Sequence, residues 1–238
     1  MVSRLDLNGL SVEVVRKPIK NVHLGVYPPH GRVRIAAPEH MELEAIRLFA
    51  IGKLSWIRRQ QARFGAQERD AHPEYIDRES HYLWGRRFLL RIKEEDATPS
   101  VRLRARTLDL QVRPGADAVQ RRDVLEAWYR EQLRDALPPL LGKWQKLLGV
   151  QARRVHLQRM KTKWGSCNPA QGSIRLNTDL ARKPIECLEY IVVHELTHLK
   201  EPTHNSNFVA LLDNSMPAWR EIRETLNSLP LSHRDWPQ

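Results

Sequence analysis

Alternation of apolar and polar residues dominates the first 115 residues and predicts an antiparallel β-rich module. Asn8-Gly9 separates two short alternating runs, 5–7 and 10–14, and this dipeptide is typical of a type I′ hairpin turn. Further alternating runs predict strands over 22–26, 32–36, 82–92 and 101–112. Pro114-Gly115 ends the alternation, so we place the end of this module at residue 115.

Elsewhere the apolar residues recur every three or four positions, which predicts helices. The pattern favours one helix over 41–64 inside the first module and a long helical region over 117–148. Pro138-Pro139 should break or kink the long helix. A strand at 154–159 and further helices follow, so the fold class is α+β, with domains at 1–115 and 116–238. No internal repeat is evident.

Two histidines stand four residues apart in the stretch Tyr190-Ile-Val-Val-His-Glu-Leu-Thr-His-Leu199. The surrounding apolar spacing predicts a helix, where such residues lie on one face about 6 Å apart along the axis. His194 and His198 could therefore bind one zinc ion. Glu195 follows the first histidine and can reach a metal-bound water without being a ligand. This pattern indicates a zinc hydrolase site.

A third ligand is required, because catalytic zinc sites take three protein ligands and keep one position for water. Pro202 cannot continue the helix, so the chain should turn soon after His198. Such a turn could bring His204 back to the metal. A solvated histidine in a surface loop is the alternative, and the spacing by itself leaves His204 open between these two roles.

Ordered sequence blocks extend around this motif. They are Met160-Lys-Thr-Lys163-Trp164-Gly165-Ser166-Cys167, Ile174-Arg-Leu-Asn177, the two-histidine stretch, His204-Asn-Ser-Asn-Phe208 and Met216-Pro217-Ala-Trp219. With these blocks the chain resembles the YgjP-like zinc metallopeptidase family, which belongs with the small gluzincin and SprT-like enzymes. The resemblance runs through the C-terminal half and continues more weakly into the N-terminal half. Val209 and Thr197 depart from the residues usual in that family.

The resemblance implies a zincin-like catalytic core over 116–238 and a peptide or protein substrate. It also implies that Zn²⁺ is held by His194, His198 and His204, with Glu195 as general base. Its sequence context further suggests substrate or supporting roles near the metal for Lys163, Trp164 and Asn177, although a structural role is the simpler interpretation of each of these three.

The chain is strongly basic, with 39 Lys and Arg against 28 Asp and Glu and a formal net charge of +11. Residues 1–150 hold 27 basic against 19 acidic residues, and residues 151–238 hold 12 against 9. Most of the surplus therefore lies before the motif. A basic surplus suits nucleic acid or a nucleotide as partner, and an ordinary solvated strand face is the alternative.

Two further properties bear on location. The two cysteines, Cys167 and Cys187, are too few for a disulfide framework and fit a reducing cytoplasm. No apolar run is long enough to suggest a membrane span, and residues 1–7 lack the apolar segment of a secretory signal. We therefore expect a cytoplasmic protein without membrane association. Its oligomeric state is open at this point.

Three functions fit these observations. The first is a zinc metallopeptidase in which Glu195 activates a metal-bound water. The second is a nucleotide triphosphate pyrophosphatase that uses the same metal site, although no Gly-rich phosphate loop accompanies it. The third is a DNA-associated protease or adaptor, whose binding to DNA would weaken steeply with salt.

Overall fold

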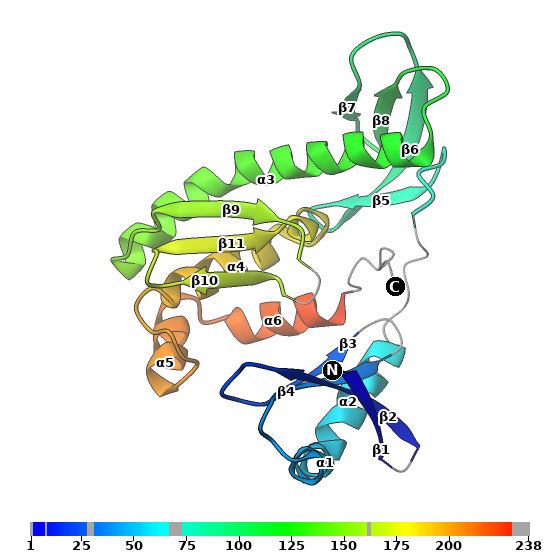
Figure 1. Ribbon diagram of the computed structural model, residues 1–238. Helices are drawn as coiled ribbons and strands as arrows, with labels where there is room; N and C mark the ends of the chain where they lie inside the picture. Colours follow the sequence, from blue (N-terminus) through cyan, green and yellow to red (C-terminus); the bar gives the residue numbers. More distant parts are fainter. Residues whose placement is uncertain (1, 8, 28–30, 67–72, 161–162, 230–238) are drawn as a thin grey trace. The chain divides into compact units, whose positions relative to one another are not determined.

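A computed structural model describes residues 2–7, 9–27, 31–66, 73–160 and 163–229. Its chain contacts divide it into two compact units, one within residues 1–71 and one within residues 72–232. Both units combine sheets with helices, as Figure 1 shows, and the predicted α+β class is confirmed. None of the described helices is long and apolar enough to cross a membrane.

The first unit is a four-stranded sheet with two helices. The sheet has the order β1-β2-β4-β3, and its elements are β1 (Val2–Leu7), β2 (Leu10–Lys17), β3 (His23–Tyr27), β4 (Arg32–Pro38), α1 (Leu43–Gly52) and α2 (Leu54–Ala66). The predicted first hairpin is confirmed, with a φ of +82° at Gly9, while Asn8 lies outside the described residues. The core of this unit contains Val12, Val14, Ile35 and Ile46, which are completely buried.

The single helix predicted over 41–64 is wrong. Helix α1 ends at Gly52, and Lys53 separates it from α2. Glycine carries a high entropic cost in a helix, which favours a break at this place. The apolar spacing continues on both sides of the break, and so it could not reveal the interruption.

The second unit opens with a sheet of the same topology. Its order is β5-β6-β8-β7, with β5 (Ser80–Leu83), β6 (Arg86–Glu94), β7 (Ser100–Leu103) and β8 (Thr107–Val112). In both units the first two strands form a hairpin, and the fourth strand runs parallel to the second. The third strand pairs with the fourth at the edge of the sheet, and a helix follows the fourth strand. The structure thus contains a repeated four-stranded arrangement that was not evident in the sequence. The parallel pairs β2–β4 and β6–β8 also correct the expectation of purely antiparallel sheets.

The long helix α3 (Ala118–Leu148) continues through Pro138 and Pro139, so the prolines do not break it, which was one of the two effects predicted for them. Each proline removes a helical hydrogen bond. Burial of Leu137 before the pair and Trp144 after it keeps both parts of the helix on the core. The ends are well defined, because a capping box at Asp117 begins the helix and left-handed Gly149 ends it.

The sheet β5–β8 belongs to the same core as α3 and the motif helix. Leu90 and Leu110 of the sheet share one apolar cluster with Leu125 and Leu133 of α3. The Tyr129 hydroxyl on α3 also donates a hydrogen bond of 2.8 Å to the backbone carbonyl of Tyr82. The compact units therefore divide near residue 72, and the boundary predicted at residue 115 lies inside the second unit.

A second, smaller sheet completes this unit. Its order is β10-β11-β9, with β9 (Arg154–Gln158), β10 (Gly165–Asn168) and β11 (Ser173–Asn177). The 3₁₀ helix η1 (Thr178–Arg182) leads to α4 (Ile185–Thr197), α5 (Ser206–Ser215) and α6 (Trp219–Ser228). Helix α4 packs between α3, this sheet and α6, which places the motif at the centre of the unit (Figure 1).

Candidate metal centre

Helix α4 carries the motif and is anchored on its apolar side. Leu188, Val192 and Leu196 are completely buried, and Cys187 is a buried core residue as well. His194 and His198 are half-buried at the border of this apolar surface. The apolar stripe therefore fixes the rotation of the helix and leaves both imidazoles beside the core.

The chain turns back directly after α4. The Glu201 amide donates a hydrogen bond of 2.9 Å to the Thr197 carbonyl, and Pro202 follows the end of the helix. The Asn205 side chain then caps α5 by accepting a hydrogen bond of 3.0 Å from the Phe208 amide. These two local signals confine the turn to a few residues, and His204 lies within it.

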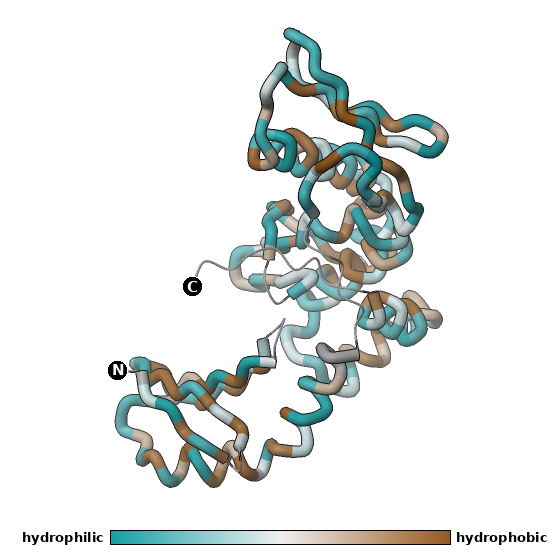
Figure 2. The backbone as a smooth tube through the Cα atoms, turned by 90° about the vertical axis from the view of Figure 1, so that its right-hand side faces the viewer, coloured by the Kyte–Doolittle hydropathy of each residue, from teal (hydrophilic) through white to brown (hydrophobic). Residues whose placement is uncertain are grey.

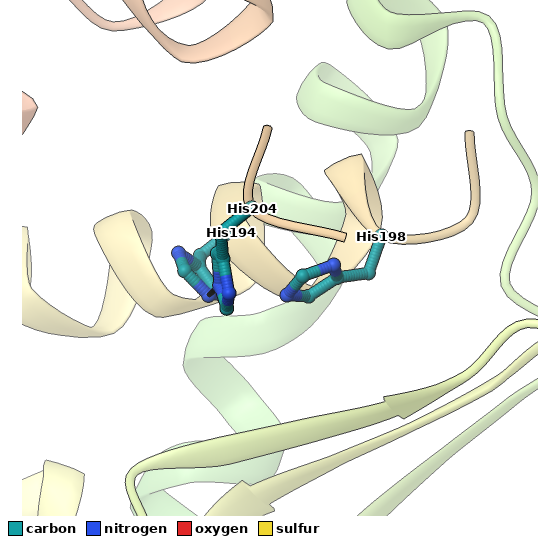
Figure 3. Close-up of side chains that lie close together, drawn as sticks. All are labelled: His194, His198 and His204. Carbon is teal, nitrogen blue, oxygen red and sulfur yellow. Dashed lines mark hydrogen bonds between the residues drawn. The ribbon is translucent and has the colours of Figure 1, made fainter. Parts of the chain in front are cut away.

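The turn brings His204 to the two histidines of α4. Potential ligand atoms of all three residues lie within 4.8 Å of one another. The Nε2 atoms of His194 and His204 are 3.0 Å apart, and Figure 3 shows the three rings gathered at one place. Tetrahedral zinc with bonds of about 2.0–2.1 Å separates its nitrogen ligands by roughly 3.3 Å, so this donor set fits the ion.

Phe208 forms an apolar wall for the three rings. Its ring centroid lies 5.0 Å from that of His194, 4.6 Å from that of His198 and 4.7 Å from that of His204. The residue is only 2% exposed. Because α5 begins just after the turn, its first helical turn limits the positions that the imidazoles can adopt.

Hydrogen bonding and burial favour the neutral, ligating form of the imidazoles. The Nδ1 atom of His198 lies 3.1 Å from the Glu201 carbonyl; if it carries the proton and donates, Nε2 is left for a metal. Burial, together with the neighbouring histidines and Arg223, lowers the pKa of His194 to about 3. Burial also lowers the pKa of His198, against the opposing effect of its bond to Glu201. The buried Nδ1 of His194 has no hydrogen-bond partner among the described residues.

Glu195 lies against the backbone of β10. A Cβ atom at Gly165 would stand 2.4 Å from its Oε1 and 2.8 Å from its Cδ, so only glycine leaves room for the carboxylate. Burial raises the pKa of Glu195 to about 8, and the positive charge of Lys163 opposes this increase. Gly165 is the first residue of β10, so the carboxylate contacts the start of this strand.

Two of the remaining candidates, Lys163 and Trp164, lie just before β10, and the third, Asn177, is the last residue of β11. The Asn177 side chain donates to the carbonyls of Met160 (2.8 Å) and Lys163 (2.9 Å), so it fixes the backbone of this segment rather than a histidine. Lys163 is exposed and acts electrostatically on Glu195. Trp164 packs at the edge of the core, 5.8 Å from the Lys183 ammonium.

An aromatic pair connects α6 to the histidines, and no local sequence pattern predicts that it belongs to the site. The Tyr190 ring lies 5.8 Å from that of His194 and stacks on Trp219 at 6.3 Å. The Arg223 guanidinium lies 5.9 Å from the Trp219 ring, which brings a second cation toward the site. The two residues of α6 lie 25 or more positions after the two residues of α4 along the chain, and only the packing of α6 on α4 makes them neighbours.

Comparisons with known proteins give partial matches to solved structures and a match to a family model. Two matching crystal structures are the metallopeptidase zymogens of Pyrococcus abyssi abylysin and Methanocaldococcus jannaschii jannalysin. The first is 28% identical with a TM-score of 0.35, over 37% of this chain and 89% of that one. The second is 26% identical with a TM-score of 0.34, over 37% and 90%. No curated protein gave a significant match. The family model "YgjP-like, metallopeptidase domain" matches residues 20–229, and the chain therefore belongs to the YgjP-like family of metallopeptidases.

Proposed function

We propose that this metallopeptidase is a zinc enzyme in which His194, His198 and His204 hold the metal and Glu195 is the general base. The convergence of the three imidazoles within 4.8 Å carries this proposal. Three histidines match the ligand number of catalytic zinc sites, and structural sites take four protein ligands. Nitrogen ligands suit zinc among several divalent metals, so metal analysis is part of the test below.

The residues divide the chemistry between them. A bound zinc ion would polarise the scissile carbonyl and lower the pKa of a water molecule. Glu195 accepts a proton from the attacking water on its carboxylate and delivers it to the leaving amine, so that the peptide bond breaks without a covalent intermediate on the protein. Gly165 and the buried surroundings keep this carboxylate in one position.

The position of β10 supports an extended peptide as substrate. This strand is at the edge of its sheet and pairs only with β11 among the described strands. An extended peptide can add to such an edge through its main-chain groups, which gives affinity without demanding one side-chain sequence. Because Gly165 of β10 contacts Glu195, a peptide at this edge would pass beside the proposed base.

Replacement of the proposed base tests the mechanism. Glu195→Gln retains the shape of the side chain but cannot accept the proton, so we expect normal metal content and a loss of peptidase activity of roughly 10²- to 10⁴-fold. Metal analysis together with kcat on a peptide library measures both. Retention of full activity in this variant would eliminate Glu195 as the base.

Removal of the third histidine tests the ligand set. We expect His204→Ala to bind zinc far more weakly than the wild type in equilibrium dialysis, because only two imidazoles remain. His156→Ala is the matched control, since His156 is exposed on β9 and is not a member of the cluster. Equal zinc affinity in both variants would show that His204 is not a ligand.

The nucleotide pyrophosphatase remains a second candidate because of two cations near the site. Lys163 acts on the Glu195 carboxylate and Arg223 acts on His194, which would favour an anionic substrate. Release of pyrophosphate from a panel of nucleoside triphosphates, abolished in Glu195→Gln, would support this activity. Cleavage of peptides beside an unreactive nucleotide panel would leave the peptidase as the function.

A further inference from the structure

The sheet β5–β8 uses its two faces differently. Its inner face packs on α3 through Phe88, Leu90, Leu108 and Leu110, which are all buried. The opposite face is solvent-exposed and polar. This alternation is visible in Figure 2 as repeated changes between teal and brown along the strands of the upper part of the molecule.

Cations crowd around a single acid on the outer face. In the strand register, Asp109 of β8 lies opposite Arg91 of β6 on one side and opposite Arg102 of β7 on the other. The Asp109 carboxylate lies 2.6 Å from Arg91, 3.3 Å from Lys93 and 3.9 Å from Arg104, and the residue is only 4% exposed. Burial opposes ionisation of Asp109, but hydrogen bonds from Arg91, Thr107 and Lys93 hold its pKa below the usual value. One carboxylate cannot neutralise three cations, so the cluster keeps a net positive charge.

Two more cations, Arg87 and Arg102, and the aromatic ring of Tyr82 lie on the same face of the sheet. Arg87 and Arg102 are exposed, and no ion pair involves either of them among the described residues. Tyr82 pairs with Arg87 across β5 and β6 and is 38% exposed. The nearest acid on β6, Glu94, is engaged with Arg121. Glu95 and Asp96 follow in the turn after β6, at one end of the sheet.

We propose that this basic sheet face, formed by Tyr82, Arg87, Arg91, Lys93, Arg102 and Arg104, binds single-stranded nucleic acid. A solvated strand face usually mixes charges of both signs, whereas here the cations of β6 and those at β7 lie on both sides of the single acid, Asp109, on β8. A polyphosphate chain presents closely spaced negative charges that match them. Tyr82 at the margin offers a surface on which an unpaired base can stack, and this combination of cations and an aromatic ring is characteristic of single-strand recognition.

This face is the side of the sheet that points away from α3. It does not include a residue of the metal centre. Its binding therefore does not depend on the proposed peptidase chemistry. The basic sheet face contains part of the excess of Lys and Arg over Asp and Glu in the sequence. It would place the catalytic unit beside proteins that are themselves bound to nucleic acid.

Fluorescence anisotropy with a labelled oligothymidine of about 20 nucleotides tests the proposal on the full-length protein. Arg87→Gln/Arg102→Gln is the informative variant, because these two arginines do not hold the buried Asp109. We expect affinity to fall roughly tenfold at about 50 mM salt, and the slope of log K against log salt to decrease by about 1.4, as two phosphate contacts are lost. Tyr82→Ala should weaken binding roughly fivefold or more through the loss of stacking.

The matched control is Arg130→Gln/Lys146→Gln, which removes the same charge from exposed positions of α3. It should bind as the wild type does, and thermal unfolding of all variants should coincide. Equal weakening in the control pair would show that only the overall charge matters and would overturn the proposal. Absence of binding at low salt, or tighter binding to duplex DNA or phosphatidylserine vesicles than to the single strand, would also overturn it.

Discussion

At the scale of single residues, the site depends on the lack of a side chain at Gly165 as well as on the side chain of Glu195. Gly165 lies where any Cβ atom would collide with the Glu195 carboxylate. Its backbone is in an ordinary strand, so the glycine is not needed for a left-handed conformation. The close approach of the carboxylate is therefore the physical reason for glycine at this position.

We expect Gly165→Ala to displace Glu195 and to lower kcat roughly 10- to 100-fold while metal content stays unchanged, since a shift of about 1 Å in a catalytic group can cost this much. Gly142→Ala is the control, because nothing lies within 4 Å of a Cβ atom at that position on α3. Metal analysis and steady-state kinetics measure the effect. A fully active Gly165→Ala variant would refute this explanation for Gly165.

At the scale of elements, α3 is connected to the chain that leads into α4 by a buried arginine. Arg182 of η1 donates to Glu126 of α3 (2.5 Å) and to Asp179 (2.8 Å). Its guanidinium also lies 3.9 Å from the Tyr129 ring centroid. A buried charge with several partners is costly to remove, because the remaining carboxylates lose their compensation.

Replacement of this arginine should therefore destabilise the second unit. We expect Arg182→Ala to lower the free energy of unfolding by about 3–5 kcal/mol. Arg134→Ala is the comparison, since Arg134 pairs with Glu131 on the surface and both side chains are more than half exposed; we expect a loss below about 1 kcal/mol. Urea unfolding followed by circular dichroism measures both values. Similar losses would mean that the buried cluster adds little stability.

At the scale of the whole molecule, the extent of the independent folding unit is the main question. The sheet β5–β8 covers α3, and the β5–β6 hairpin also contacts the start of the motif helix. A Cβ atom at Gly85 would lie 3.0 Å from Pro184, and the Trp84 amide donates to the Ala181 carbonyl at 2.8 Å. These contacts indicate that the sheet supports the helix that carries the candidate metal centre.

A fragment of residues 72–232 should therefore fold and bind zinc with the affinity of the full chain. A fragment of residues 116–238 should aggregate or fail to unfold cooperatively, because the buried face of α3 around Leu125 and Leu133 would lose its cover. Thermal unfolding and metal titration distinguish the two. Cooperative unfolding of the shorter fragment would support the boundary at residue 115 instead.

The sequence by itself determined the local features of this protein. Helical spacing put His194 and His198 on one face, Pro202 required a turn, and alternation located the strands, because each of these depends on neighbours in the chain. Even His204 was a candidate through its position after the turn. The family blocks around the motif indicated a metallopeptidase, in agreement with the family match.

The tertiary structure decided what depends on contacts between distant segments. Gly165 and Glu195 lie 30 residues apart, and no local pattern could relate a glycine to a carboxylate on another element. The continuity of α3 through Pro138 and Pro139 likewise results from burial on both sides of the prolines, which outweighs a local preference. The inclusion of β5–β8 in the second unit follows from the apolar face that they share with α3, and hydrophobic burial acts between segments regardless of their separation in sequence.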